Sequence, residues 1–380
     1  MNNSKTHLLN HFKHMKEAFF FLLLIGTVAC KKDGGTVTPI IPSVPQPPAV
    51  VEDILKTTAT FPMGVAIDPT LLRDKTAYRN LILKEHNSIT VENAMKWGTI
   101  HTAENGYNFA GADYIVNFAS DNKIRIHGHT LLWHAYNPTW LNNFKGDSTA
   151  WEGLMKSHIK EVAGHFKGKL SGWDVVNEAF NDAGSLRTGL GSEGSIWATK
   201  LGEDYISRAF QYAAEADPNA LLFYNDYGQE YSTAKLASIL KMVKDLQKRK
   251  IPIQGVGLQF HISIKSNITG IENALKELAA TGLKIHISEL DVNFSNFTKD
   301  ATITFSEANS AAQKKMYKQV MLSYRRIVPM SQQYGITCWN VGDADSWLRP
   351  AIQTNEWPLP FDDNYQRKPA YFGIIEGLKE

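Results

Sequence analysis

From residue 51 onward, short apolar segments alternate with longer stretches in which apolar positions recur every three to four residues. The short segments are rich in β-branched and aromatic residues, and we predict each of them to be a buried strand. The eight predicted strands are Phe61–Ile67, Ser88–Val91, Ile124–His129, Gly172–Val176, Leu221–Tyr224, Gly255–Phe260, Lys284–Ile287 and Gly335–Trp339. The stretches between them are predicted to be amphipathic helices, for example Thr149–Phe166, Glu203–Ala216, Thr233–Arg249, Ile271–Ala280 and Ala311–Ile327.

This alternation of strands and helices determines the expected fold class. Most successive strands begin more than about thirty residues apart, which leaves room for one βα unit each. Eight such units predict an α/β fold, namely a (β/α)8 TIM barrel that forms a single catalytic domain over residues 51–380. Active sites of such barrels lie at the carboxyl ends of the strands, so functional side chains are expected there.

Two of the predicted strands lead directly into a glutamate. Glu178 follows the run Trp173–Asn177, and Glu289 follows Ile287 and Ser288. Buried strands usually end in turn residues, and a carboxylate held away from water costs free energy. Two carboxylates at one end of a barrel indicate a paired site of the kind that cleaves glycosidic bonds.

The alternative interpretation is that each glutamate is a solvated strand end or half of a structural ion pair. Neighbouring residues favour the paired site. Asn177 offers an amide that can hydrogen-bond a sugar hydroxyl, and Asp291 lies on the same side of its strand as Glu289. Asp291 can therefore tune that carboxylate.

The N-terminal segment has the pattern of an export signal. Residues 1–29 contain the apolar run Ala18–Ala29, which is too short to span a bilayer and is typical of a signal-peptide core. Translation could begin at Met1 or at Met15, since Met15 gives the more compact signal. We predict that residues 1–29 are a signal peptide of the lipoprotein type.

Cys30 follows this apolar run directly, and the junction resembles the cleavage and lipidation box of bacterial lipoproteins. Thr27 stands where that box usually has leucine. Residues 30–50 would then be a lipidated cysteine and a proline-rich, extended tether. The expected location is an exported lipoprotein, anchored in a membrane through Cys30 and facing the periplasm or the cell surface. A plain secretory signal followed by a disordered segment is the alternative.

The composition is that of a soluble globular protein, with 43% apolar and 21% charged residues. The net charge of +2 gives no basic face of the kind that nucleic acid requires. Nine Trp and fourteen Tyr could supply rings on which sugars stack. Besides Cys30 there is only Cys338, which lies in an apolar run and is interpreted as a small buried hydrophobic residue.

Seven segments match a known family, and each closes a predicted strand in the family's order. The chain resembles the glycoside hydrolase family 10 endo-β-1,4-xylanases over nearly all of residues 51–380. The matching segments are Val91–Trp97, Gly128–His134, Trp173–Ala179, Leu222–Tyr227, Gly255–His261, Ile287–Asp291, and Trp339 with Trp347.

The resemblance implies retaining endo-hydrolysis of β-1,4-xylosidic bonds, with Glu178 as general acid/base and Glu289 as nucleophile. The two carboxyl groups of a retaining enzyme lie about 5–5.5 Å apart. The pKa of Glu178 is expected to be raised, so that it can donate a proton. Substrate-binding roles are implied for Asn93, Lys96, His129, Trp133, Asn177, Gln259, His261, Trp339 and Trp347.

The implied partner is xylan or a xylo-oligosaccharide. No cofactor, no metal and no obligatory protein partner is implied. Three residues depart from the family's pattern. Tyr136 stands where glutamine is usual, and Asn340 and Gly342 replace a usual glycine and threonine. These changes affect the sugar subsites and leave the two glutamates untouched.

Three other functions are compatible with parts of the sequence. His127, His129 and His134 could form a zinc site in a metal-dependent hydrolase, since His127 and His129 lie on one side of a strand. The same chemistry could act on another β-1,4-glycan, either cellulose or a mixed-linkage glucan. The chain could also be a non-catalytic glycan-binding lipoprotein, because a fold does not guarantee activity.

Overall fold

The computed structural model describes residues 52–380, and Glu52–Glu380 form one compact unit. The predicted signal peptide, Cys30 and the proline-rich tether lie outside the described residues. Within residues 52–380, no helix combines the length and the apolar character needed to cross a membrane.

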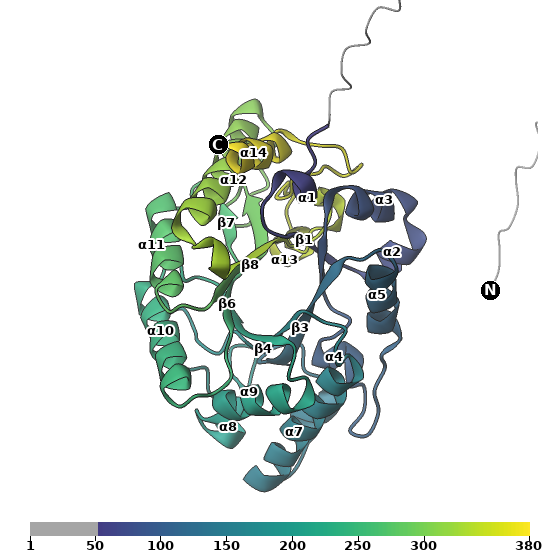
Figure 1. Cartoon of the computed structure of the whole chain (residues 1–380), viewed down its shortest axis with the longest axis vertical. Coiled ribbons are helices and arrows are strands. Elements are labelled where there is room, and N and C mark those ends of the chain that lie inside the picture. The colour runs from purple at the N-terminus through teal and green to yellow at the C-terminus, as the bar shows by residue number, and fades with distance from the viewer. Residues whose placement is uncertain (1–51) are drawn as a thin grey trace, which may run out of the picture. The chain divides into compact units, whose positions relative to one another are not determined.

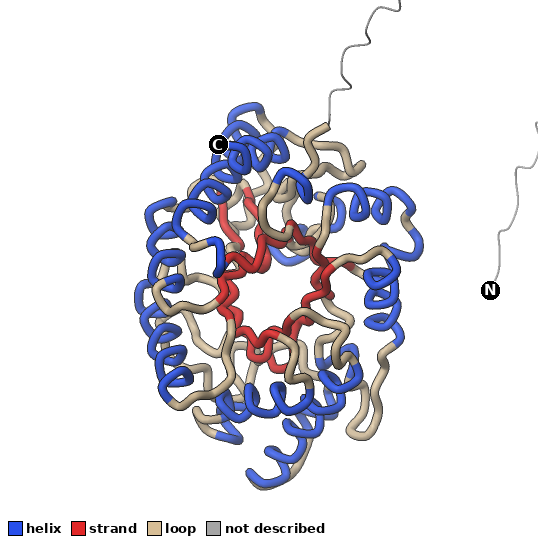
Figure 2. Tube along the Cα trace, viewed as in Figure 1, coloured by secondary structure: helices blue, strands red, loops and turns tan. Residues whose placement is uncertain are grey.

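Eight parallel strands close into a barrel, which Figure 2 shows end-on as a ring. Neighbours follow the chain from β1 to β6, and then β6 pairs with β8, β8 with β9, and β9 with β1. The strands are β1 Met63–Ile67, β2 Ser88–Val91, β3 Arg125–Trp133, β4 Gly172–Asn177, β5 Leu221–Asp226, β6 Gly255–Leu258, β8 Lys284–Asn293 and β9 Gln333–Cys338. The ninth strand, β7 His261–Ser263, pairs only with the second half of β8.

Helices surround the barrel (Figure 1). Side chains of Asp147, Ser232, Asn267 and Ser306 cap the amino ends of the longest helices after β3, β5, β7 and β8. The helices are α1 Leu55–Thr58, α2 Pro69–Asp74, α3 Thr76–Glu85, α4 Trp97–Ile100, α5 Ala110–Asp121, α6 Thr139–Asn143, α7 Ser148–His165, α8 Ile196–Leu201, α9 Tyr205–Ala216, α10 Thr233–Lys248, α11 Ile268–Ala279, α12 Glu307–Ile327, α13 Leu348–Ile352 and α14 Pro369–Lys379. Two short 3₁₀ turns span Met330–Gln332 and Asp343–Asp345.

The predicted (β/α)8 barrel is confirmed, and each of the eight predicted strands overlaps an observed one. The first strand was predicted to start at Phe61, but it begins at Met63, because Pro62 has no amide hydrogen for the ladder. The last predicted strand, Gly335–Trp339, is shifted slightly and occupies Gln333–Cys338.

The largest difference concerns the strand that carries Glu289. The prediction placed Glu289 at a strand end, whereas β8 continues to Asn293. Polar residues interrupt the apolar pattern after Ile287, yet the backbone stays paired, with His261 opposite Asp291 on the neighbouring β7. Glu289 therefore lies on a rigid strand rather than on a loop.

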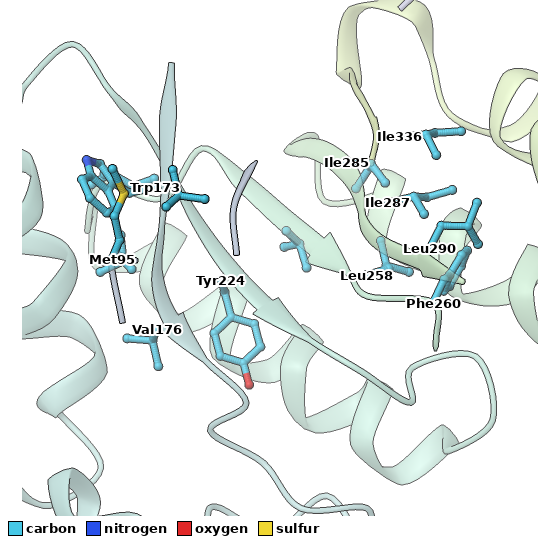
Figure 3. Close-up of a cluster of buried hydrophobic side chains, with 14 of the residues drawn as sticks. Met95, Trp173, Val176, Tyr224, Leu258, Phe260, Ile285, Ile287, Leu290 and Ile336 are labelled. Atoms are coloured by element: carbon cyan, nitrogen blue, oxygen red, sulfur yellow. The ribbon is translucent and has the colours of Figure 1, made fainter. Parts of the chain in front are cut away.

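The apolar core packs between the outer faces of the strands and the helices. In α9, the buried residues Ile206, Ala209, Phe210 and Ala213 recur at helical spacing, and this helix packs on β4. Figure 3 shows part of the core, to which Met95, Trp173, Val176, Tyr224, Leu258, Phe260, Ile285, Ile287, Leu290 and Ile336 belong. Each such side chain contributes about 1.5–3 kcal/mol by its burial.

The interior of the barrel is filled by polar and aromatic side chains rather than by aliphatic ones. His127 on β3, His286 on β8 and Tyr334 on β9 meet there, and the Tyr334 hydroxyl lies 3.2 Å from His127 Nδ1. Arg125 donates to the Tyr334 carbonyl at 2.6 Å and stacks over its ring. This plug closes the barrel beneath the carboxyl ends of the strands.

Candidate active site

A cavity of about 1090 Å³ lies at the carboxyl ends of the barrel strands. We refer to it as the main cavity. All eleven residues for which the sequence predicts catalytic or sugar-binding roles line it, although they come from segments up to 254 residues apart, from residue 93 to residue 347. These residues are Asn93, Lys96, His129, Trp133, Asn177, Glu178, Gln259, His261, Glu289, Trp339 and Trp347.

Glu178 is placed in the main cavity by an unusual backbone conformation. It follows β4 with φ of +54°, a left-handed value that costs free energy for a residue with a side chain. Its amide donates to the Asn225 carbonyl at 2.9 Å, which holds this turn in place. Backbone strain of this kind is typical of functional sites, where the surrounding structure fixes the residue.

The Glu178 carboxylate accepts hydrogen bonds from three neighbouring side chains. Gln259 Nε2 donates to Oε1 at 2.9 Å, and Asn177 Nδ2 donates to the same oxygen at 3.1 Å. Trp133 Nε1 donates to Oε2 at 2.9 Å. A carboxylate surrounded by donors is stabilised in its ionised form.

The expectation of a raised pKa for Glu178 is wrong for this unliganded structure. Burial raises the pKa of this carboxyl, but the bonds from Gln259 and Trp133 and the nearby charges of His134 and Lys235 lower it further. The net pKa of Glu178 lies below its ordinary value. Sequence reasoning considered the neighbouring carboxylate and overlooked the donors that face Glu178.

Glu289 is held by two donors on neighbouring strands. Asn225 Nδ2 on β5 donates to Glu289 Oε1 at 2.7 Å, and His261 Nε2 on β7 lies 3.2 Å from Oε2. Asn225 Nδ2 also donates to Asn177 Oδ1 at 2.9 Å, and Asn177 in turn donates to Glu178. Two asparagines therefore connect the two glutamates.

Asn225 was not among the predicted site residues, although it lies in one of the matched segments. Its signal in the sequence is an asparagine near the end of an apolar strand. Such an amide is fully buried in the fold and requires hydrogen-bond partners. Besides Glu289 and Asn177, its Oδ1 accepts a hydrogen bond from the Ser288 hydroxyl at 2.6 Å. This set of bonds fixes the orientation of the Asn225 side chain.

His261, Asp291 and Trp347 form a charged group beside Glu289. His261 Nδ1 lies 2.7 Å from Asp291 Oδ2, and Trp347 Nε1 donates to the same oxygen at 2.9 Å. Burial opposes protonation of His261, but the charges and hydrogen bonds of Asp291 and Glu289 outweigh it and raise the pKa of His261 to about 10. His261 is thus an imidazolium at neutral pH and donates to both carboxylates.

Replacing Asp291 with asparagine should lower the pKa of His261, because one of its two negative neighbours loses its charge. In the native protein, the ring carbon signals of His261 should titrate near pH 10 in an NMR experiment, and in Asp291→Asn at least one unit lower. Asp113→Asn is the matched control, since its partner His165 lies far from the main cavity. An unchanged titration of His261 in Asp291→Asn would contradict the assignment of its charge.

At the end of the main cavity formed by the loop after β2, Lys96 lies among aromatic rings. Its ammonium donates to Asn93 Oδ1 at 2.9 Å and lies 4.9 Å from the Trp133 ring and 5.6 Å from the Trp339 ring. Burial lowers the pKa of Lys96. This end combines donors, a carboxylate from Glu92 and flat apolar walls, a combination that suits a sugar ring.

The zinc interpretation of the three histidines is not supported by their placement. His127 Nε2 and His129 Nδ1 lie 2.9 and 2.8 Å from the two oxygens of Asp174, which hold both rings. His134 instead faces Glu178, with its Nδ1 3.8 Å from Oε2. Among residues 52–380, no three His, Cys, Asp or Glu side chains converge as a metal site would require.

The opposite end of the main cavity was not predicted from the sequence. It is lined by the loops after β5, β7 and β8 and by α11, which contribute Tyr227, Gln229, Glu230, Tyr231, Lys265, Asn273 and Phe297 among others. Glu230 has a carboxyl whose pKa burial raises to about 7. Loop residues of this kind have no strand pattern, so only the folded chain brings them to the site.

The barrel, and the two linked glutamates in the cavity at the carboxyl ends of its strands, have the arrangement expected of a glycosidase of the (β/α)8 class. The profile of glycosyl hydrolase family 10 matches residues 51–377. The chain belongs to this family.

Over the aligned residues, two curated relatives are 35% and 37% identical to this chain. The chain is 37% identical to Exoglucanase XynX of Acetivibrio thermocellus over 334 residues, which cover 84% of the chain and 29% of that protein. It is 35% identical to Endo-1,4-beta-xylanase B of Paenibacillus barcinonensis, covering 83% and 95% of the two chains. Four of the curated relatives are longer proteins, and the chain spans only between 27% and 56% of their length.

Solved structures share the fold. A mutant of xylanase10C from Cellvibrio japonicus in complex with xylopentaose superposes with a TM-score of 0.81 at 34% identity, covering 87% of this chain and 69% of that one. Native xylanase 10B from Thermotoga maritima gives a TM-score of 0.79 at 33% identity, covering 86% and 98%.

Proposed function

We propose that this protein is a retaining endo-β-1,4-xylanase that cleaves internal bonds of xylan. The observation that carries the proposal is the pair Glu178 and Glu289, held in one cavity and linked through Asn177 and Asn225. Glu289 attacks the anomeric carbon, and Glu178 protonates the leaving oxygen. Water then hydrolyses the glycosyl-enzyme, with Glu178 acting as the base.

In this proposal Glu289 is the nucleophile, and its contacts support that role. Donors on both of its oxygens, from Asn225 and His261, orient the carboxylate on β8. Glu178 sits at a strained turn beside Asn177, whose amide is also placed to bond the 2-hydroxyl of the reacting sugar.

Glu178 must gain a proton before it can act as an acid. In the free protein, donors from Gln259, Asn177 and Trp133 stabilise its ionised form. A bound polysaccharide expels water from the cavity, and its hydroxyl groups can accept hydrogen bonds from these three donors. Both changes raise the pKa of Glu178, so protonation is coupled to substrate binding.

The relatives, together with a cavity lined by aromatic rings and hydrogen-bonding side chains, support xylan as the substrate class. One relative is named an exoglucanase, so cleavage of a β-1,4-glucan is the second candidate function. Reducing-sugar release from xylan beside carboxymethylcellulose separates the two. We expect release from xylan, and release from carboxymethylcellulose alone would favour the glucan.

We further propose that the protein is a lipoprotein anchored through Cys30, which supports action on polymers outside the cell. Full-length protein expressed in a bacterium should partition with membranes, because several acyl chains anchor a protein stably. Cys30→Ser should appear in the soluble fraction or remain unprocessed. The matched control is Cys338→Ser, which leaves the junction after Ala29 intact. Soluble behaviour of both the native chain and Cys30→Ser would refute the anchor.

A further inference from the structure

A second cavity of about 530 Å³ lies beside the main cavity, between the loops that follow β3 and β4. Its volume falls within the range of about 300–1,000 Å³ that is typical of small-ligand sites. The lining side chains that matter most here are those of His134, Tyr136, Asn137, Asn142, Leu190 and Ser192. None of them belongs to the eleven predicted site residues.

The second cavity shares a wall with the main cavity. His134 lines the second cavity, and its Nδ1 lies 3.8 Å from Glu178 Oε2. The Tyr136 ring lies 5.8 Å from the ammonium of Lys96, which lines the main cavity. A group attached to a sugar near Lys96 is therefore within reach of the second cavity.

Hydrogen bonds fix the loops on both sides of the second cavity. Tyr136 adopts a left-handed conformation with φ of +56°, and its carbonyl accepts a hydrogen bond from Gly98 N at 2.9 Å. On the other side, the buried Arg187 donates to the Glu193 carbonyl at 3.1 Å and to the Tyr227 hydroxyl at 2.8 Å. The cavity is thus shaped before any ligand arrives.

The chemistry of the lining is uncharged and suited to hydroxyl groups. It offers the amides of Asn137 and Asn142, the hydroxyl of Ser192 and the half-exposed ring of Tyr136. Burial lowers the pKa of His134 and so favours its neutral form. Within residues 52–380, Asn137 Oδ1 is buried without a hydrogen-bond partner. Buried polar atoms of this kind call for a ligand or water.

The described lining of the second cavity contains no lysine or arginine that could bind a carboxylate ligand. The nearby guanidinium of Arg187 is already engaged by Glu193, whose carboxylate lies 2.7 Å from it. A negatively charged ligand would therefore have no partner there, whereas a neutral sugar would find donors, acceptors and an aromatic ring.

We propose that the second cavity binds a neutral pentosyl branch carried by the xylan main chain near Lys96. The proposal rests on the proposed xylanase function and adds a preference for branched substrate. It also gives a role to Tyr136, one of the three residues that depart from the family's pattern. A uronosyl branch, which carries a negative charge, should gain nothing from this site.

The test compares kcat/KM for a xylo-oligosaccharide with one arabinofuranosyl branch and for the unbranched chain of equal length. Ser192→Trp, which fills the second cavity, should lower the branched-to-unbranched ratio about tenfold, as expected for two lost neutral hydrogen bonds. Thr188→Trp, on the same loop but outside the lining, should leave the ratio unchanged. Asn142→Ala, which adds no bulk, should lower it about threefold.

An unchanged ratio in both Ser192→Trp and Asn142→Ala would overturn the proposal. An equal loss on the unbranched chain would also overturn it, because the cavity would then bind the main chain. Calorimetric binding of both oligosaccharides in a Glu178→Ala background gives the same comparison without turnover. Branch-dependent binding there, with no cleavage by the native protein, would count against the proposed function and not against the cavity.

Discussion

Glu289→Ala is expected to abolish turnover on every glycan substrate while the barrel remains folded. Covalent attack requires a carboxylate held at the anomeric carbon, and loss of such a nucleophile typically costs on the order of 10⁴-fold or more in kcat. The fold should persist because Glu289 lies on β8, whose backbone pairs with β6, β7 and β9. Circular dichroism and thermal unfolding provide the check on the fold.

The matched control for Glu289→Ala is Glu230→Gln, which alters another buried carboxyl of the same cavity. Glu230 makes none of the hydrogen bonds that link the two proposed catalytic glutamates. Its replacement should therefore reduce kcat far less than the loss of Glu289. Residual cleavage in Glu289→Ala within tenfold of the native rate would show that another group attacks the sugar.

Glu178→Ala is expected to separate the two steps of the reaction. Hydrolysis of xylan should fall by a factor on the order of 10²–10⁴, because xylan has a poor leaving group that needs general acid catalysis. An aryl xylobioside with an acidic phenol needs no such help, so it should still form the glycosyl-enzyme. That intermediate should then accumulate, because no base remains to activate water.

Added azide should restore turnover of the aryl xylobioside by Glu178→Ala, since azide attacks without a general base. The product should be the β-glycosyl azide, identified by NMR. The same addition to Glu289→Ala should not produce this compound, which makes that variant the control. Equal losses on xylan and the aryl substrate, without azide rescue, would remove the acid/base role of Glu178.

Much of the fold follows from the periodicity of apolar residues. The eight barrel strands were located because β-branched runs recur between helical patterns, and the carboxyl ends of these strands carry the site. The pattern could not reveal that β8 continues past Glu289 to Asn293. Pairing with β7 provides that extension, and it depends on a contact between distant segments.

The site residues also divide into those that the sequence predicts and those that only the folded chain brings together. Residues at strand ends, such as Glu178 and Gln259, were predicted from the matched segments. Asn225 was overlooked because one amide in an apolar strand does not identify its partners. The pKa of Glu178 depends on donors and charges from three separate segments, around Trp133, Lys235 and Gln259, and the second cavity depends on two loops without regular structure. Such features arise only when the folded chain brings these groups together.

The most direct test of the central claim is the configuration of the first product. In the proposed mechanism, Glu289 and then water displace groups at the same anomeric carbon, so two inversions restore the original configuration. Proton NMR spectra recorded during cleavage of xylohexaose should show the β-anomer of the new reducing end first, with the α-anomer appearing later by mutarotation. An α-anomer as the first product would mean a single displacement by water, and Glu289 would then not be the nucleophile.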